Sequence, residues 1–180
     1  MNELPKRYSK TAIALHWITA VMIFIALVVG GPLLAEIDNS NPEKISALQG
    51  HMIMGLLVGV LMLVRVVVRV TSTRPAPKQT GSALLDRLGG LTHTLLYVLV
   101  FGMVASGIGM SILANLPEIV FQGVGELPTS FHELPPRIAH GIIAKILMAL
   151  IVLHTVGALY HHFKLKDGLL SKMGIGRPRD

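Results

Sequence analysis

The sequence lacks cysteine altogether, and only 14% of its 180 residues are Asp, Glu, Lys or Arg. Without thiols the chain forms neither disulfides nor thiolate-bound iron–sulfur clusters, and it offers no C-x-x-C-H motif for covalent attachment of a haem. A bound metal or metallated cofactor must therefore be held by imidazole, carboxylate or thioether groups. Histidine, which is present eight times, is the candidate ligand.

Long polar stretches are also scarce. Hydrophobic residues make up 52% of the chain and its mean hydropathy is +0.62, values typical of a protein whose main solvent is lipid. Four apolar runs are long enough to cross a hydrocarbon core of about 30 Å at about 1.5 Å per residue. The first run exceeds the roughly 7 to 15 apolar residues of a signal peptide, so we interpret it as a mature helix. The sequence predicts an all-α integral membrane bundle of four transmembrane helices, a single domain over residues 1–180 with spans at about 11–35, 45–70, 84–115 and 137–163.

The net charge of +6 is distributed unevenly along the chain. Lys and Arg predominate in both tails and after the second apolar run, whereas Asp and Glu predominate after the first and third runs. By the positive-inside rule both termini are cytoplasmic, which four spans allow. Topology and anionic lipid head groups then account for the basic residues of the tails, and the sequence predicts no nucleic-acid partner.

Four histidines lie within the apolar runs, where an ionisable side chain is costly and indicates a function by default. His16 and His154 lie six and ten residues from the basic residues that flank their spans on the cytoplasmic side, at depths of roughly 9 and 15 Å. His51 and His140 lie seven and three residues from the outer flanking charges, at depths of roughly 10 and 5 Å. These depths predict an inner pair, His16 with His154, and an outer pair, His51 with His140.

Paired imidazoles at matching depths are typical of a planar haem held between facing helices of a bundle. Two axial imidazoles leave no open coordination position, which favours electron transfer over oxygen chemistry at the iron. Two other interpretations are hydrogen bonds across the helices and a zinc site, which wants about four ligands although no Asp or Glu lies within the apolar runs. His93, at the cytoplasmic start of the third span, is an alternative ligand to His16.

Over nearly its whole length the chain resembles the bacterial cytochrome b561 type of four-helix, di-haem b membrane protein. The resemblance rests on a series of short motifs: Tyr8-Ser9, Leu15-His16-Trp17, His51, Leu61-Met62-Leu63-Val64-Arg65 with Arg69, Thr92-His93 leading to Tyr97, His140, Leu153-His154, His161-His162 and Lys166-Asp167. It implies one haem b between His16 and His154 and a second between His51 and His140. It also implies a multi-pass protein of the bacterial inner membrane.

The resemblance further implies a connection with the quinone pool. The family moves electrons between quinone and a partner on the outer face, and some members are superoxide oxidases that reduce ubiquinone. His161 resembles a histidine near the cytoplasmic quinone site, where it can supply protons near neutral pH, and Lys78 is a further candidate there; contact with lipid or a haem propionate is the alternative for His161. Arg65 and Arg69 are expected to bind haem propionates or, alternatively, lipid phosphates.

Two functions are therefore expected. The first is a superoxide:ubiquinone oxidoreductase, in which superoxide is oxidised at the outer face; the alternative is a non-enzymatic haem b subunit that relays electrons from an outer-face redox partner within a larger dehydrogenase or hydrogenase-like complex. A haem-free bundle that carries protons or metal is a third hypothesis. The acidic outer loops disfavour an anionic substrate, although Lys44, Arg137 and Lys145 are candidates for a local positive funnel. The sequence leaves the oligomeric state open.

Overall fold

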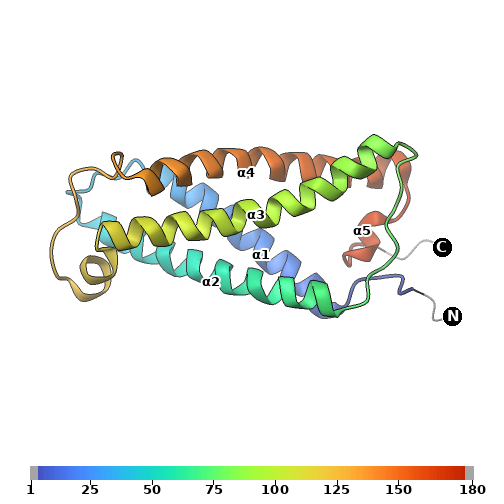
Figure 1. The fold of residues 1–180 in the computed structure, drawn as a ribbon, viewed down its shortest axis with the longest axis horizontal. Coiled ribbons are helices and arrows are strands. Elements are labelled where there is room, and N and C mark those ends of the chain that lie inside the picture. Colours follow the sequence, from blue (N-terminus) through green and yellow to red (C-terminus); the bar gives the residue numbers. More distant parts are fainter. Residues whose placement is uncertain (1–3, 177–180) are drawn as a thin grey trace.

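The computed structural model describes residues 4–176, and every regular element in that range is helical. Four long helices, each antiparallel to the next along the chain, form one elongated bundle (Figure 1). They are α1 (Lys10–Val28), α2 (Glu43–Thr71), α3 (Ala83–Leu113) and α4 (Pro135–Tyr160). The shorter elements are the π-helical turns η1 (Val29–Leu33), η2 (Glu118–Gln122) and η3 (His161–Leu165) and the helix α5 (Leu169–Lys172).

All four long helices have the length and composition needed to cross a membrane. Only 6–17% of their most apolar segments is buried inside the protein, and large apolar side chains are exposed along every one of them. In water this would leave an apolar surface far larger than soluble monomers expose. The prediction of an all-α bundle of four transmembrane helices is therefore confirmed.

The helix ends follow local sequence signals. Ser9 caps α1, because its hydroxyl accepts a hydrogen bond of 3.2 Å from the N–H of Ala12. Two prolines open α4, where their fixed φ fits the helix and their missing N–H has no partner to lose. η2 ends at Gly123, whose φ of 68° is a left-handed conformation that glycine adopts readily. Gly30 and Gly31, residues that commonly end a helix, instead lie within η1, which continues α1.

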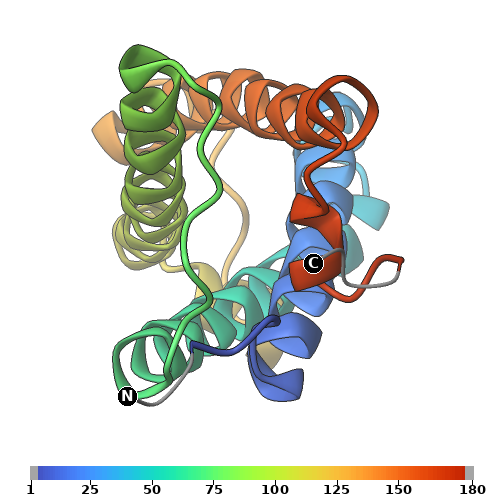
Figure 2. The ribbon, with the colours of Figure 1, turned by 90° about the vertical axis from the view of Figure 1, so that its right-hand side faces the viewer.

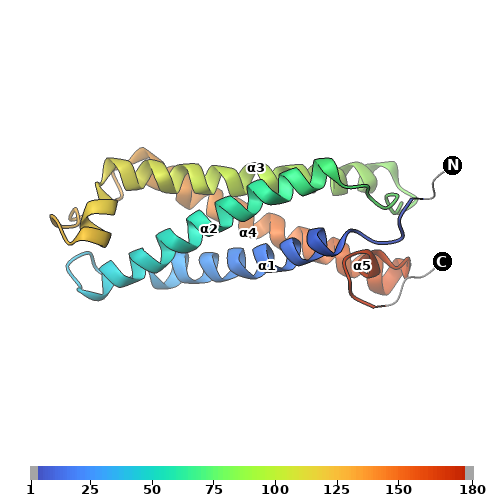
Figure 3. The same cartoon turned by 90° about the horizontal axis from the view of Figure 1, so that it is seen from below.

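The two ends of the bundle hold different segments. Both termini, α5 and the 72–82 segment lie at one end, here the terminal end, and the 34–42 and 114–134 segments lie at the other, the loop end (Figures 1 and 3). Seen from the terminal end, the four helices stand at the corners of a roughly square section, and α5 lies beside α1 (Figure 2). The closest helix pairs are α3 with α4, α1 with α2, and α2 with α3. α1 and α4 are packed less closely.

The segment that follows α4 is hydrogen-bonded to residues near the start of the chain. The indole Nε1 of Trp17 donates to the carbonyl of Met173 at 2.9 Å, and the backbone N–H of Tyr8 donates to the carbonyl of Lys172 at 3.2 Å. The Lys172 ammonium donates to the carbonyl of Ala76, which connects α5 to the 72–82 segment. These contacts hold the terminal end together around the last residues of α4.

Lys44 organises the loop end from the first turn of α2. It is only 4% exposed, and its ammonium donates to the carbonyls of Leu34 at 2.8 Å and Ile37 at 2.7 Å. Asn39 joins the two loops, because its amide donates to the carbonyl of Pro128 at 2.7 Å. The Lys44 ammonium is thus buried and hydrogen-bonded inside the protein, so it does not contribute to an exposed positive surface that could attract an anion.

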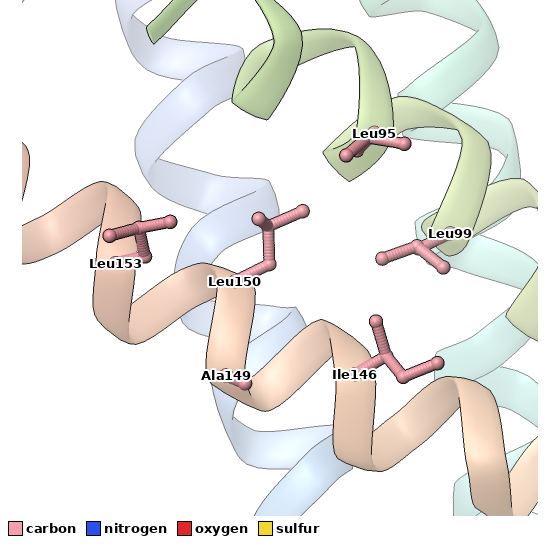
Figure 4. A pocket seen from close by; sticks show the side chains of 6 residues that line it. All are labelled: Leu95, Leu99, Ile146, Ala149, Leu150 and Leu153. Carbon is pink, nitrogen blue, oxygen red and sulfur yellow. The ribbon is translucent and has the colours of Figure 1, made fainter. Parts of the chain in front are cut away.

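A shallow hollow of about 250 Å³ lies between α3 and α4. Figure 4 shows the apolar side chains that line it: Leu95, Leu99, Ile146, Ala149, Leu150 and Leu153. Ligand sites combine apolar walls with a few polar groups that orient the ligand, and this lining has no polar side chain. Within a bilayer the hollow suits the hydrocarbon chains of lipids.

Candidate functional site

The structure brings His16 and His154 together near the terminal end. His16 lies in the second turn of α1 and His154 in the last two turns of α4. Their ring centroids are 6.3 Å apart, the ring planes are inclined by 64°, and both side chains are half-buried. The two histidines that the sequence places at similar depths therefore face each other.

His51 and His140 form the corresponding pair nearer the loop end. His51 lies in the third turn of α2 and His140 in the second turn of α4. Their ring centroids are 6.2 Å apart and the planes are inclined by 73°. α4 thus contributes one imidazole to each pair, as the depths of the four histidines predict.

The separation of the rings tests whether a metal fits between them. A direct hydrogen bond between two imidazoles, with about 3 Å between nitrogens, brings the ring centres to about 5 Å. One metal bound at about 2 Å from each nitrogen places the centres about 6 Å apart, which is the spacing of both pairs. The described residues contain no cluster of three or more His, Cys, Asp or Glu side chains that could hold an ion. The remaining donor atoms must therefore come with the metal, as the porphyrin nitrogens of haem do.

Ser106, on α3, is within hydrogen-bond distance of His140. Its Oγ lies 3.0 Å from the carbonyl of Met103 and 2.9 Å from Nδ1 of His140. A hydroxyl has a single proton to donate; if that proton goes to the Met103 carbonyl, the Ser106 oxygen accepts from Nδ1–H of His140. The lone pair of the imidazole is then on Nε2, which is the form that binds a metal.

His51 depends on a glycine of η1. A Cβ atom at Gly30 would lie only 2.6 Å from Cε1 of His51 and 3.1 Å from its Nδ1. Residue 30 therefore has to be glycine if the ring is to keep its place. Nδ1 of His51 is buried and has no hydrogen-bond partner within the described residues, so no protein contact prescribes its tautomer.

Arg65 lies against the inner pair. Its Nη1 donates to Oγ1 of Thr19 at 2.9 Å, and its Nη2 is 3.1 Å from Nδ1 of His16. Arg65 and Arg69 also lie 5.5 and 5.6 Å from the ring centre of Tyr97, within cation–π range. Because guanidinium only donates, Nδ1 of His16 accepts here, and a neutral His16 would carry its proton on Nε2. Binding of iron through Nε2 therefore requires that Arg65 release this nitrogen.

His93 is the third imidazole of the inner group. Its Nδ1–H donates to the carbonyl of Gly89 at 2.8 Å, and its ring centroid is 5.1 Å from that of His154. This separation is shorter than the spacing of about 6 Å that suits a metal between two rings. The geometry therefore favours His16 over His93 as the partner of His154.

His161 and Lys78, the residues expected at a quinone site, both lie near Asp167 at the terminal end. Nδ1 of His161 is 2.6 Å from Oδ2 of Asp167, and Lys78 acts electrostatically on the same carboxylate. His162, by contrast, is exposed and its ring centroid lies 4.8 Å from that of Phe163. The carboxylate of Asp167 is thus the group that connects the two expected residues.

Comparison with known sequences identifies the family. Residues 7–176 match the family described as prokaryotic cytochrome b561. The chain belongs to this family. It is 27% identical to cytochrome b561 homolog 2 of Escherichia coli (strain K12), with 96% of this chain and 93% of the relative covered. It is 30% identical to cytochrome b562 of Cereibacter sphaeroides, with 96% of each covered, and 24% identical to the probable superoxide oxidase CybB of Yersinia pestis, with 93% and 96% covered.

Membership makes this cytochrome b561 a membrane haem protein of electron transport, with haem b as the cofactor that the family implies. Its four spans make it a multi-pass protein of the bacterial inner membrane, in contact with the lipid bilayer along each long helix. The two ring pairs of this cytochrome b561 fit a haem iron in their spacing. At the outer pair, Ser106 is placed to hold Nδ1 of His140, whereas at the inner pair Arg65 contacts Nδ1 of His16.

Proposed function

We propose that the protein transfers electrons across the membrane between a donor at the outer face and the quinone pool, through two haem b groups. We assign His16 and His154 as axial ligands of the inner haem, and His51 and His140 as those of the outer haem. The observation that carries this assignment is the spacing of the two ring pairs, 6.3 and 6.2 Å, which suits one metal between each pair. Residues 1–180 then act as a single di-haem domain.

Haem b would supply one-electron exchange when bound, and iron held by two imidazoles would have no position left for oxygen. The chain's own residues orient the imidazoles and exclude water. Ser106 holds the ring of His140, Gly30 leaves room for that of His51, and lipid-facing apolar side chains surround the helices. We assign Arg65 and Arg69 to haem propionates, because their guanidinium groups lie together beside Tyr97 at the level of the inner pair.

The terminal end faces the cytoplasm in this proposal. Both tails and the 72–82 segment, where Lys and Arg predominate, lie at that end, and such segments stay on the cytoplasmic side. The inner pair is then the one that delivers electrons to quinone on the cytoplasmic side. Ubiquinone binds beside His161 and Lys78.

Superoxide is the donor in the reaction that we favour. Two superoxide anions and one ubiquinone, with two protons, give two dioxygen molecules and one ubiquinol. The relative from Yersinia pestis, named a probable superoxide oxidase, supports this activity. Near the outer pair Lys145 is exposed and Arg137 half-buried, and positive charge there attracts an anion.

A relay of electrons from a soluble partner protein is the second candidate. The loop end exposes two large apolar side chains, Phe121 at 46% and Val124 at 60%. Exposed apolar side chains of this kind are typical of docking surfaces. In that case superoxide would not be a substrate.

Haem content and quinone reduction test the proposal separately. The purified wild-type chain is expected to hold two haem b, and His51→Ala or His140→Ala is expected to lose the outer one; two haems in either variant would disprove the outer site. Superoxide added with ubiquinone is expected to give ubiquinol. If reduction stays at the uncatalysed rate while both haems are present, the oxidase is rejected and the relay remains.

A further inference from the structure

We infer that Asp167 is a positioning residue that holds His161 so that its Nε2 delivers a proton to quinone as the quinone is reduced. The inference rests on the proposed quinone site beside His161 and Lys78. It concerns a residue that touches neither the quinone nor a haem in our proposal and acts through the imidazole.

The contact between the two side chains is short and partly shielded. Oδ2 of Asp167 lies 2.6 Å from Nδ1 of His161, and the two side chains are 17% and 14% exposed. An ionised carboxylate only accepts hydrogen bonds, so Nδ1 of His161 carries the proton. Nε2 is then the nitrogen that takes up and gives off a proton.

The backbone after α4 is shaped to present Asp167 to His161. The residues on either side, Lys166 and Gly168, have φ angles of 52° and 76°, so the chain turns sharply at this point. Oδ1 of Asp167 accepts from the backbone N–H of Leu169 at 2.9 Å, at the start of α5. Both carboxylate oxygens therefore take part in hydrogen bonds, and rotation of the side chain would break both bonds.

The charges around the pair keep Asp167 ionised. Burial alone would raise the pKa of its carboxyl group, but hydrogen bonds from His161 and from the N–H of Leu169 hold that pKa below the ordinary value, and the nearby Lys78 adds to this. Lys172, on α5, is a second cation that interacts with the Asp167 charge. Asp167 is therefore a carboxylate throughout the neutral range, with Lys78 and Lys172 as the cations around it.

A quinone that receives two electrons from two superoxide anions must also take up two protons. When both nitrogens of His161 are protonated, Nε2–H can donate to a quinone oxygen while Asp167 balances the positive charge of the ring. As the electrons arrive, the N–H bond at Nε2 breaks and an O–H bond forms on the quinone. His161 is left neutral with its proton on Nδ1, and Nε2 is ready to be protonated again from the cytoplasm.

Asp167→Asn is the decisive variant, because Asn has the same shape and its side-chain oxygen can accept the same backbone hydrogen bond from Leu169. Its carbonyl oxygen keeps the hydrogen bond from the Leu169 N–H, so its NH₂ group faces Nδ1 of His161. Because an amide NH₂ only donates, His161 is expected to move its proton to Nε2. In ¹⁵N spectra of the full-length, haem-loaded chain labelled at histidine, with His161→Gln used for assignment, we expect this reversal of tautomer.

The functional readout is the rate of ubiquinone reduction across pH. Loss of a positioned acid and base typically lowers a rate by about 10² or more. We expect the rate of ubiquinone reduction by Asp167→Asn to be at least about tenfold lower than that of the wild type, with a changed pH profile. The variant should still hold two haems and keep its melting temperature. Asp167→Glu, which restores a carboxylate, should recover part of the rate.

Three outcomes would overturn the inference. If wild-type and Asp167→Asn have the same rate and pH profile while His161→Gln is impaired, Asp167 has no positioning role although the quinone site stands. If the tautomer of His161 does not change in Asp167→Asn, the contact with Asp167 does not determine which ring nitrogen carries the proton. If the wild-type chain reduces no ubiquinone, or His161→Gln reduces it normally, the proposed quinone site itself fails and the inference falls with it.

Discussion

The hydroxyl of Ser106 lies 2.9 Å from Nδ1 of His140, within hydrogen-bond distance across the interface of α3 and α4. When its own proton goes to the carbonyl of Met103 on the same helix, the Ser106 oxygen accepts from Nδ1–H of His140. Contacts of this kind orient a metal-binding imidazole and raise its basicity. No comparable partner is present for His51 within residues 4–176, so the two imidazoles of the outer pair are held by different means.

Removal of the acceptor should weaken the outer haem site without destroying the fold. In Ser106→Ala the Nδ1–H of His140 loses its partner, and such losses typically cost 10- to 100-fold in metal affinity. We expect about that loss in affinity for the second haem equivalent, measured by haem titration of the apoprotein. Ser111→Ala is the matched control, because the Ser111 hydroxyl bonds only the carbonyl of Gly107 in its own helix. Equal affinities in the two variants would contradict the role of Ser106.

A methyl group at residue 30 should displace the ring of His51. In Gly30→Ala the new Cβ would lie 2.6 Å from Cε1 of His51, a distance that forces the ring or η1 to move. We expect loss of the outer haem with retention of the inner one, seen as one haem per chain in the visible spectrum. Gly31→Ala adds the same atom where nothing lies within 4 Å, and it should keep two haems. A Gly30→Ala chain with two haems and an unchanged spectrum would refute the close approach.

The positive charge of Arg65 should favour the reduced state of the inner haem. Arg65 is half-buried at the level of the inner pair, so its field is screened less than that of a surface charge. In Arg65→Gln we expect the midpoint potential of the inner haem to fall by on the order of tens of millivolts, with the outer potential unchanged, in a potentiometric titration. Arg69→Gln, at an exposed position beyond Tyr97, should give a smaller shift. A larger shift for Arg69 than for Arg65 would count against this assignment of the nearer charge.

The sequence predicts the depth of each residue in the membrane better than its rotation about a helix axis. Apolar runs and flanking charges predict the four helices, and the depths of the four histidines predict the pairs that the structure brings together. The contacts of Ser106 with His140 and of Arg65 with His16 depend on how two helices are rotated and packed, which hydropathy does not report. Gly30 lies in a Gly-Gly-Pro run that is typical of a helix end, so the sequence does not predict its role beside His51. In the structure the chain continues there as a π-turn. The ligation of haem by the four histidines stays a prediction.

Lys44 and Lys145 provide a direct test of which charges at the outer side serve structure and which serve the substrate. Lys44→Met leaves the carbonyls of Leu34 and Ile37 without their donor, and we expect a loss of about 1–3 kcal/mol in stability. The superoxide reaction of this variant should stay at the wild-type rate, because the Lys44 charge is buried.

The same substitution at Lys145, which is exposed on α4, should have the opposite effects. Lys145 lies within a membrane span, where a charged side chain is more costly than an apolar one, so Lys145→Met should not lower the melting temperature. It should react more slowly with superoxide at low ionic strength, and high salt should remove the difference because screening weakens attraction over distance. Thermal melts and rates at two salt concentrations measure both effects. A slower, salt-dependent reaction in Lys44→Met rather than in Lys145→Met would show that the buried lysine, not the exposed one, attracts the anion.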